Sequence, residues 1–328
     1  MRTFGRFLGR LLLVVVLCVG AAFVFGPYEQ ISLTPTVQDA DIGSDVDAYF
    51  AAQEARFEDI TTGTEKRVVW HSERGEKTPV VLVYVHGFSA TSEEIRPVPD
   101  RVAEALGANL VYTRLQGHGR DGVALAEATA QGWVNDVAEA LNVARRIGDV
   151  VVVMGTSTGG TVMAALADQP DVMAGVAGMI FVSPNFGIRA PAAKLLTWPA
   201  ARYWVPVVAG KDRSFEPANE AHATYWTHEY PTVAVMQMAA LVKAVSKKDH
   251  GKALVPALFW FSEGDQVVEA ARTQDVATRW GREATVQIQQ PMAGADPQEH
   301  VIAGDIRSPA ENERAIEFFT NFVNGLTR

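Results

Sequence analysis

One serine stands between two glycines in the stretch VVVMGTSTGG, where Gly155, Ser157 and Gly159 have the spacing G-x-S-x-G. The apolar run before this serine is typical of a buried strand, and a helical pattern follows it. In a tight turn from strand to helix, side chains at the flanking positions would collide with the chain, and glycine avoids both collisions. The hydroxyl would then be exposed at a helix N-terminus, whose free N–H groups favour developing negative charge. The pattern therefore predicts that Ser157 is a nucleophile.

A serine hydroxyl needs a base and an acid, which should follow it in the order serine, acid, histidine. Of the seven histidines, only His300 lies beyond the last candidate strands, so it is the predicted base. Asp265 is the predicted acid because it follows an apolar strand directly, in FSEGDQVV, and Glu263 is the alternative. Surface or structural roles are expected for His71, His86, His222, His228 and His250.

Attack by a serine on a carbonyl group also needs two backbone donors for the oxyanion that forms. One donor is expected from Thr158, the residue after the predicted nucleophile. The other should come from the loop after an early strand, where VYVHGFSA places Phe88 behind a sharp turn at His86-Gly87. The backbone N–H groups of Phe88 and Thr158 are therefore the predicted oxyanion hole.

Strands and helices alternate from about residue 66 onwards, which predicts a mostly parallel sheet with helices on both faces. Apolar runs typical of strands occur at 67–71, 79–85, 109–113, 149–154, 178–183, 257–262 and 284–289. Helical patterns occur at 92–106, 133–147, 158–168 and 311–323, and a short amphipathic helix is predicted at 46–57.

The alternation breaks between Gly187 and Lys252, in a segment rich in tryptophan and tyrosine with helical pattern near 191–203 and 233–247. This insert is too long for a simple crossover, so we expect a helical cap over the carboxyl edge of the sheet, where open α/β sheets bind ligands. The expected parts are an N-terminal membrane segment (1–27), a linker with a short helix (28–65), the core (66–186 and 253–328) and the cap (187–252).

The chain has 328 residues and a net charge of −9, which argues against nucleic acid as a partner. Its single cysteine, Cys18, excludes an intrachain disulfide, a cysteine-based metal site and thiol catalysis. We expect no metal site. A hydrophobic content of 48% with 20% charged residues is that of a globular protein with a sizeable core.

The N-terminus has Arg2, Arg6 and Arg10 before an apolar run from Leu11 to Phe25, which indicates a segment addressed to a membrane. An uncleaved anchor is expected, with the arginines in the cytoplasm and the remainder of the chain on the other side, periplasmic or extracellular. The alternative is a signal peptide, with cleavage after Ala21 and secretion.

Five motifs together resemble those of the α/β-hydrolase superfamily: GTSTG at 155–159, HGF at 86–88, RLQGHG at 114–119, GDQVV at 264–268, and His300. Within that superfamily, the chain is similar to monoacylglycerol lipases, lysophospholipases and small bacterial carboxylesterases. The resemblance covers about residues 66–323. It implies an α/β-hydrolase fold, Ser157 as nucleophile, His300 as base, Asp265 as acid, Phe88 and Thr158 as oxyanion donors, and no cofactor.

The expected reaction is hydrolysis of a carboxylic ester through an acyl-enzyme, with a small acyl-ester or lipid-like molecule as substrate. Thioesterase, amidase or acyltransferase chemistry would use the same three residues and is the alternative. A catalytically silent binding protein of the same fold is the remaining alternative. The sequence leaves acyl-chain length and oligomeric state open.

Overall fold

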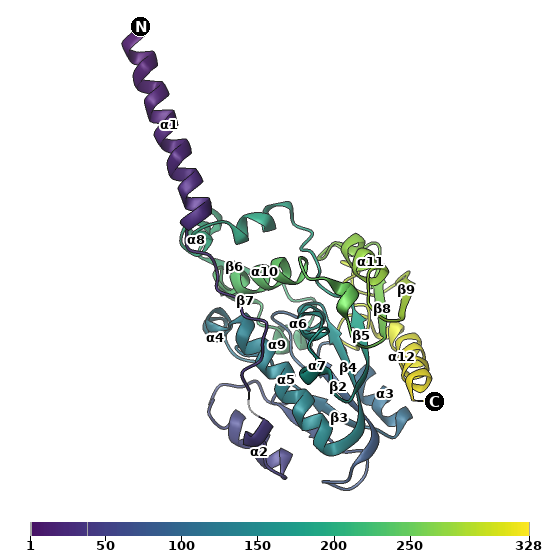
Figure 1. Cartoon of the computed structure of the whole chain (residues 1–328). Helices are drawn as coiled ribbons and strands as arrows, with labels where there is room; N and C mark the ends of the chain where they lie inside the picture. Colours follow the sequence, from purple (N-terminus) through teal and green to yellow (C-terminus); the bar gives the residue numbers. More distant parts are fainter. Residues whose placement is uncertain (1, 38, 328) are drawn as a thin grey trace.

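A seven-stranded sheet forms the centre of the computed structural model, which describes residues 2–37 and 39–327 (Figure 1). The strand order is β1-β3-β2-β4-β5-β8-β9, and every neighbouring pair is parallel except β1 and β3. The strands are β1 (Arg67–Val69), β2 (Thr78–Val85), β3 (Asn109–Tyr112), β4 (Gly148–Thr156), β5 (Val176–Val182), β8 (Ala257–Ser262) and β9 (Ala284–Gln289). The mostly parallel sheet predicted from the sequence is confirmed.

The side chains of β2 explain why this sheet is covered on both faces. Val81, Val83 and Val85 lie in one apolar cluster, whereas Leu82 and Tyr84 lie in another. Successive side chains of a strand point to opposite faces, so a continuous apolar run requires two cores. Two layers of helices supply the cover.

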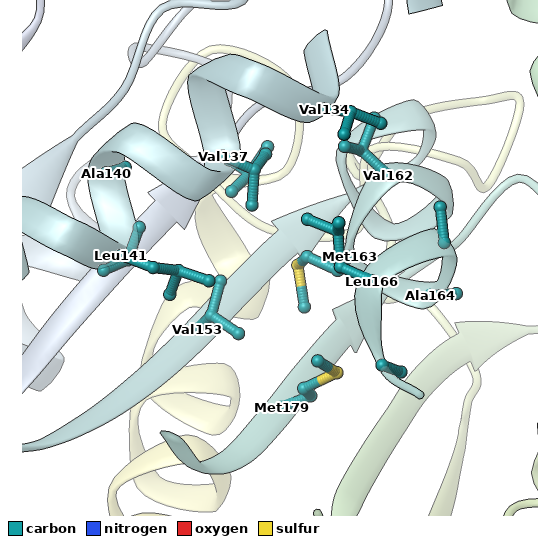
Figure 2. Close-up of a cluster of buried hydrophobic side chains, with 14 of the residues drawn as sticks. Val134, Val137, Ala140, Leu141, Val153, Val162, Met163, Ala164, Leu166 and Met179 are labelled. Carbon is teal, nitrogen blue, oxygen red and sulfur yellow. The ribbon is translucent and has the colours of Figure 1, made fainter. Parts of the chain in front are cut away.

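On one face, the cover comes mainly from α5 (Ala130–Ile147) and α6 (Thr158–Leu166). Figure 2 shows side chains of both helices pointing toward Val153 of β4 and Met179 of β5. The other face packs against α3 (Val98–Leu106) and α12 (Asn312–Leu326). The remaining helices of the core region are α2 (Val46–Glu54), α4 (Gly122–Glu127), α7 (Pro170–Met173) and α11 (Ala270–Thr278), with 3-10 turns η1 (Asp39–Asp41), η3 (His250–Lys252) and η4 (Pro309–Glu311).

The helix expected at 92–106 begins only at Val98, and this prediction was wrong by almost two turns. Pro97 and Pro99 cause the difference. A proline has no backbone N–H and is tolerated only in the first turn of a helix, so no helix can continue back through both positions.

The insert expected at 187–252 is less purely helical than the sequence predicts. A 3-10 turn, η2 (Pro191–Thr197), and α8 (Ala201–Ala209) replace the single helix expected near 191–203, because Pro199 interrupts it. A two-stranded antiparallel sheet, β6 (Asp212–Ser214) with β7 (Glu229–Pro231), was not predicted. The insert also contains α9 (Glu220–Tyr225) and α10 (Ala234–Val245).

The N-terminal helix α1 (Arg2–Phe25) projects away from the rest of the chain (Figure 1). Its part from Phe4 to Phe25 is long and apolar enough to cross a membrane, and it is exposed throughout. The segment after it, expected to be a linker, is docked on the core. The backbone N–H of Thr36 donates to Asn135 Oδ1 at 2.8 Å.

Candidate active site

The predicted site residues meet at one edge of the sheet. Phe88 follows β2, Ser157 follows β4, Asp265 follows β8 and His300 follows β9. These four strands are parallel, so their carboxyl ends lie together and the loops after them share one space.

Ser157 is held in a backbone conformation that few residues other than glycine adopt, with φ 49° and ψ −116°. Its N–H donates to the carbonyl of Val182 at 2.9 Å, and its own carbonyl accepts from Asn185 N–H at 3.1 Å. Val182 is the last residue of β5, the strand beside β4, and Asn185 lies in the loop that follows β5. These two bonds secure the strained turn between β4 and α6.

The two glycines expected to relieve this turn do so. A Cβ at Gly155 would overlap the Sδ of Met163, and one at Gly159 would overlap the carbonyl oxygen of Val85. The second contact is with the end of β2. Gly159 therefore also permits the close approach between α6 and the loop that carries Phe88.

A chain of hydrogen bonds joins the three side chains predicted to react together. His300 Nε2 lies 3.0 Å from Ser157 Oγ, and His300 Nδ1 lies 2.7 Å from Asp265 Oδ2. Asp265 is completely buried. Its other oxygen accepts from the backbone N–H groups of Val267 and Val268, at 2.7 and 2.9 Å. These bonds fix the carboxylate against the imidazole.

The environment of His300 favours its protonated form. Burial lowers the pKa of the imidazole, but the charge and hydrogen bond of Asp265 and the charges of other nearby carboxylates together outweigh burial, so the pKa of His300 is raised above its ordinary value. These other carboxylates are Glu94 and Asp296. A base of this kind accepts a proton from a hydroxyl more readily than a free imidazole does.

The two predicted oxyanion donors share a pocket with Ser157. Phe88 and Thr158 both line the same pocket as Ser157 and His300, and Thr158 is the first residue of α6. Within residues 2–37 and 39–327, neither backbone N–H has a hydrogen-bond partner. The ring of Phe88 packs edge-on against His118 and Tyr230, which fixes the loop.

Glu94 was not predicted from the sequence, yet it lies directly against this site. Its Oε2 accepts from Gly87 N–H at 2.7 Å and from the hydroxyl of Tyr84 at 3.0 Å. The same hydroxyl lies 3.0 Å from Thr156 Oγ1. Glu94 thus links the residue before Phe88 to the residue before Ser157. Burial raises the pKa of Glu94 to about 7, although the hydrogen bond from Gly87, the one from Tyr84 and the charge of His300 each lower it.

A pocket of about 650 Å³ opens over Ser157. Polar side chains in its wall include those of Glu94, His222, Asp296 and Arg307. The cap supplies many of its apolar side chains, through Ile188, Leu195, Leu196, Trp204, Val205 and Val208. A ligand with both apolar and polar groups fits such a lining.

The alternative candidates lie elsewhere. Glu263 is exposed, so Asp265 and not Glu263 is the carboxylate on His300. His86 is buried, and its Nε2 accepts from Leu115 N–H at 3.1 Å, as a structural residue would. His250 packs between Phe186 and Trp280, and His222 reaches the pocket wall. Within the described residues, no group of three or more His, Cys, Asp or Glu could hold a metal ion.

The fold and family of this chain define a serine hydrolase of the α/β-hydrolase superfamily, in the lipase and esterase class. Residues 76–291 match the family model described as "Serine aminopeptidase, S33", and the chain belongs to that family.

Individual relatives agree with this assignment. A thermostable monoacylglycerol lipase of Bacillus sp. (strain H-257) is 26% identical over 245 residues, which are 74% of this chain and 92% of the lipase. A metagenome-derived lipolytic enzyme has a similar structure, with a TM-score of 0.66 and 19% identity over 81% of this chain and 99% of that one. A soluble variant of the Saccharomyces cerevisiae monoglyceride lipase gives a TM-score of 0.59 and 10% identity, over 80% of this chain and 92% of the lipase.

The position of Glu94 makes a prediction about the oxyanion loop. Glu94→Ala leaves Gly87 N–H and the Tyr84 hydroxyl without their shared acceptor, at a cost of about 1–3 kcal/mol. If the loop needs this anchor to present Phe88, kcat on a soluble p-nitrophenyl ester falls about 10- to 100-fold while KM changes less. Glu93→Ala is the matched control because Glu93 pairs with Arg96, at 2.8 Å. Equal losses in both variants would contradict this role.

The charges around His300 predict the pH profile. The imidazole must be neutral to accept the serine proton, so kcat/KM rises with pH through the raised pKa of His300, above the ordinary value of about 6.5. Glu94→Gln removes one negative group that raises this pKa, so the acid limb moves to lower pH. The measurement is kcat/KM from about pH 5 to 9 for both proteins. An acid limb that stays in place or moves upward in the variant would exclude this coupling.

Proposed function

We propose that the chain hydrolyses carboxylic esters through an acyl-enzyme, with Ser157 as nucleophile, His300 as base and Asp265 as the acid that orients the base. The observation that carries the proposal is the hydrogen-bonded series Asp265–His300–Ser157 at the wall of the pocket. Each carboxylate and imidazole contact in it has the length of a direct hydrogen bond.

In the first half of the reaction, Ser157 Oγ attacks the acyl carbon while His300 Nε2 takes the hydroxyl proton. The carbonyl oxygen becomes an oxyanion, which accepts from the backbone N–H groups of Phe88 and Thr158. The intermediate collapses with cleavage of the carbon–oxygen bond, and His300 returns the proton to the leaving alcohol. Water then attacks the acyl-enzyme by the same route and releases the acid.

The pocket supports an ester with a moderately apolar acyl chain and a small polar alcohol. Much of its apolar lining comes from the cap, and Glu94, Asp296 and Arg307 are among its polar lining residues. Relatives named as monoacylglycerol lipases act on substrates of this type. A monoacylglycerol or lysophospholipid is the substrate class that we propose.

An amide substrate is the second candidate, because the family description names an aminopeptidase. Thioester cleavage and acyl transfer to an alcohol would use the same three residues. Matched ester, thioester and amide substrates with a common acyl group distinguish these reactions, with and without an added alcohol acceptor.

We further propose that α1 anchors the enzyme in a membrane, with the catalytic part on the non-cytoplasmic side. The helix from Phe4 to Phe25 has 22 residues, or about 33 Å, close to the thickness of a hydrocarbon core. Arg6 and Arg10 lie in the first two turns of this stretch, before the apolar run from Leu11, and favour a cytoplasmic position for that end. Cleavage after Ala21 with release of the enzyme is the alternative.

The first prediction concerns the nucleophile. The detergent-solubilised full chain should hydrolyse p-nitrophenyl esters, and Ser157→Ala should lower kcat by at least about 10³-fold because the acyl-enzyme cannot form. Rates across acyl lengths from acetate to laurate measure the depth of the apolar pocket. A wild-type enzyme that is folded but inactive on every ester would turn the proposal toward amides or thioesters.

The second prediction separates the base from other buried histidines. His300→Ala should lower kcat by about 10³-fold or more, since no other described imidazole is hydrogen-bonded to Ser157. His250→Gln is the matched control because His250 is also buried but packs against Trp280. It should retain kcat within about threefold, on a scale where tenfold is 1.4 kcal/mol. If His250→Gln lost kcat as strongly as His300→Ala while its thermal unfolding stayed normal, the assignment of His300 as the base would be wrong.

A further inference from the structure

The cap helix α8 is apolar on both of its sides. Ala201 and Val205 are buried against Met236 of α10. On the outer side, Tyr203 and Val207 remain 70% and 82% exposed. A helix that is apolar all round normally lies in a protein core or in lipid. No described part of the chain covers the outer side of α8.

The only charged side chain of α8 does not make this outer side polar. Arg202 pairs with Glu29 through two hydrogen bonds, at 2.7 and 2.8 Å, and so belongs to the junction with the N-terminal segment. Val208, next to Val207, is also exposed, at 71%. The outer surface of α8 therefore combines one tyrosine with two valines.

This surface lies at the base of the membrane helix (Figure 1). The rings of Phe23 in α1 and Trp198 before α8 pack edge-on, 5.3 Å apart. The backbone N–H of Ala200 donates to the carbonyl of Pro27 at 2.7 Å, just after α1 ends. A bilayer that contains α1 would therefore end close to α8.

The charge of the same segment also favours a membrane. Although the whole chain has a net charge of −9, residues 189–213 contain five basic residues and one acidic residue. Basic and aromatic residues around an apolar helix are typical of segments that lie in the interface of an anionic bilayer. The basic residues are Arg189, Lys194, Arg202, Lys211 and Arg213, and the acidic one is Asp212. Arg202 pairs with Glu29 and Arg189 donates to the carbonyl of Asp265, so Lys194, Lys211 and Arg213 supply the charge that favours an anionic surface.

We propose that the outer surface of α8, formed by Tyr203, Val207 and Val208, lies in the interface of an anionic lipid bilayer beside α1. The proposal rests on the membrane anchoring proposed above. A second copy of the chain fits this surface less well, because two copies would bring together the same excess of positive charge.

This arrangement gives the catalytic pocket direct access to lipid. Trp204 and Val208 belong to α8 and also line the pocket over Ser157. An acyl chain in the outer leaflet would then reach the apolar part of the pocket without crossing bulk water. The proposal therefore predicts a difference between soluble and membrane-embedded substrates.

The test of position uses a single environment-sensitive label. Cys18 is the only cysteine, so Cys18→Ser with Val207→Cys gives one labelling site in the full chain. In vesicles of phosphatidylcholine with phosphatidylglycerol, a nitrobenzoxadiazole label at position 207 should shift its emission to the blue and be quenched by spin-labelled lipid. Ile288→Cys, at an exposed position on β9, is the control and should report water.

Two results of this test overturn the proposal. A label at 207 that reports water, as at 288, excludes insertion of α8. A blue shift that grows with protein concentration at constant lipid, without lipid quenching, assigns the surface to a second copy of the chain. Sedimentation of the wild type with the vesicles tests membrane anchoring by itself. A failure of the proposed anchor is therefore distinguishable from a failure of α8 to insert.

The test of function compares two substrates. Val207 lies outside the catalytic pocket, so Val207→Asp should leave kcat/KM on p-nitrophenyl butyrate unchanged. Turnover of a long-chain monoacyl ester in anionic vesicles should fall about fivefold or more, because the variant places a negative charge at the anionic surface. Equal rates for variant and wild type on both substrates, or equal losses on both, overturn the proposal. Absence of hydrolysis by the wild type would instead refute the ester function.

Discussion

The backbone of Ser157 is the constraint on which the site depends. Its positive φ turns the chain sharply from β4 into α6, so the hydroxyl projects from the edge of the sheet. That turn is possible only because Gly159 lets α6 approach the carbonyl of Val85 at the end of β2. The loop after β2 carries Phe88, so the same contact brings the proposed oxyanion donor to the proposed nucleophile. Strain at one residue thus sets the geometry of two elements.

Two buried carboxylates act on this site in different ways. Asp265 is fixed by two backbone N–H groups and faces His300 directly, so its charge stabilises the imidazolium. Among the described residues, Glu94 has no cationic partner in direct contact, and it accepts from Gly87 and Tyr84. Burial raises the pKa of Glu94 to about 7, so its charge changes near neutral pH. One carboxylate thus orients the imidazole, whereas the other holds the loop after β2.

The sequence predicted those features that depend on local pattern and chain order. The strands were recognisable as apolar runs, and Ser157, Asp265 and His300 followed strand ends in the expected order. Glu94 was missed because nothing in TSEEIRPVPD indicates that its side chain turns back to Gly87, which is a tertiary contact. The β6–β7 pair was missed because strands of three exposed or half-buried residues have no apolar run.

The whole-chain charge conceals the most distinctive part of the cap. The net charge of −9, from which we expect no nucleic-acid partner, is an average over the chain, and the excess of basic residues at 189–213 is visible only in a local count. The meaning of that count depends on the three-dimensional structure, because only the fold places α8 at the base of α1 and on the wall of the pocket over Ser157. Exposed apolar side chains, nearby basic residues and contact with the proposed membrane helix occur together in this part of the cap. Water hydrates the basic groups but leaves Tyr203, Val207 and Val208 exposed, whereas an anionic interface accommodates both kinds of side chain.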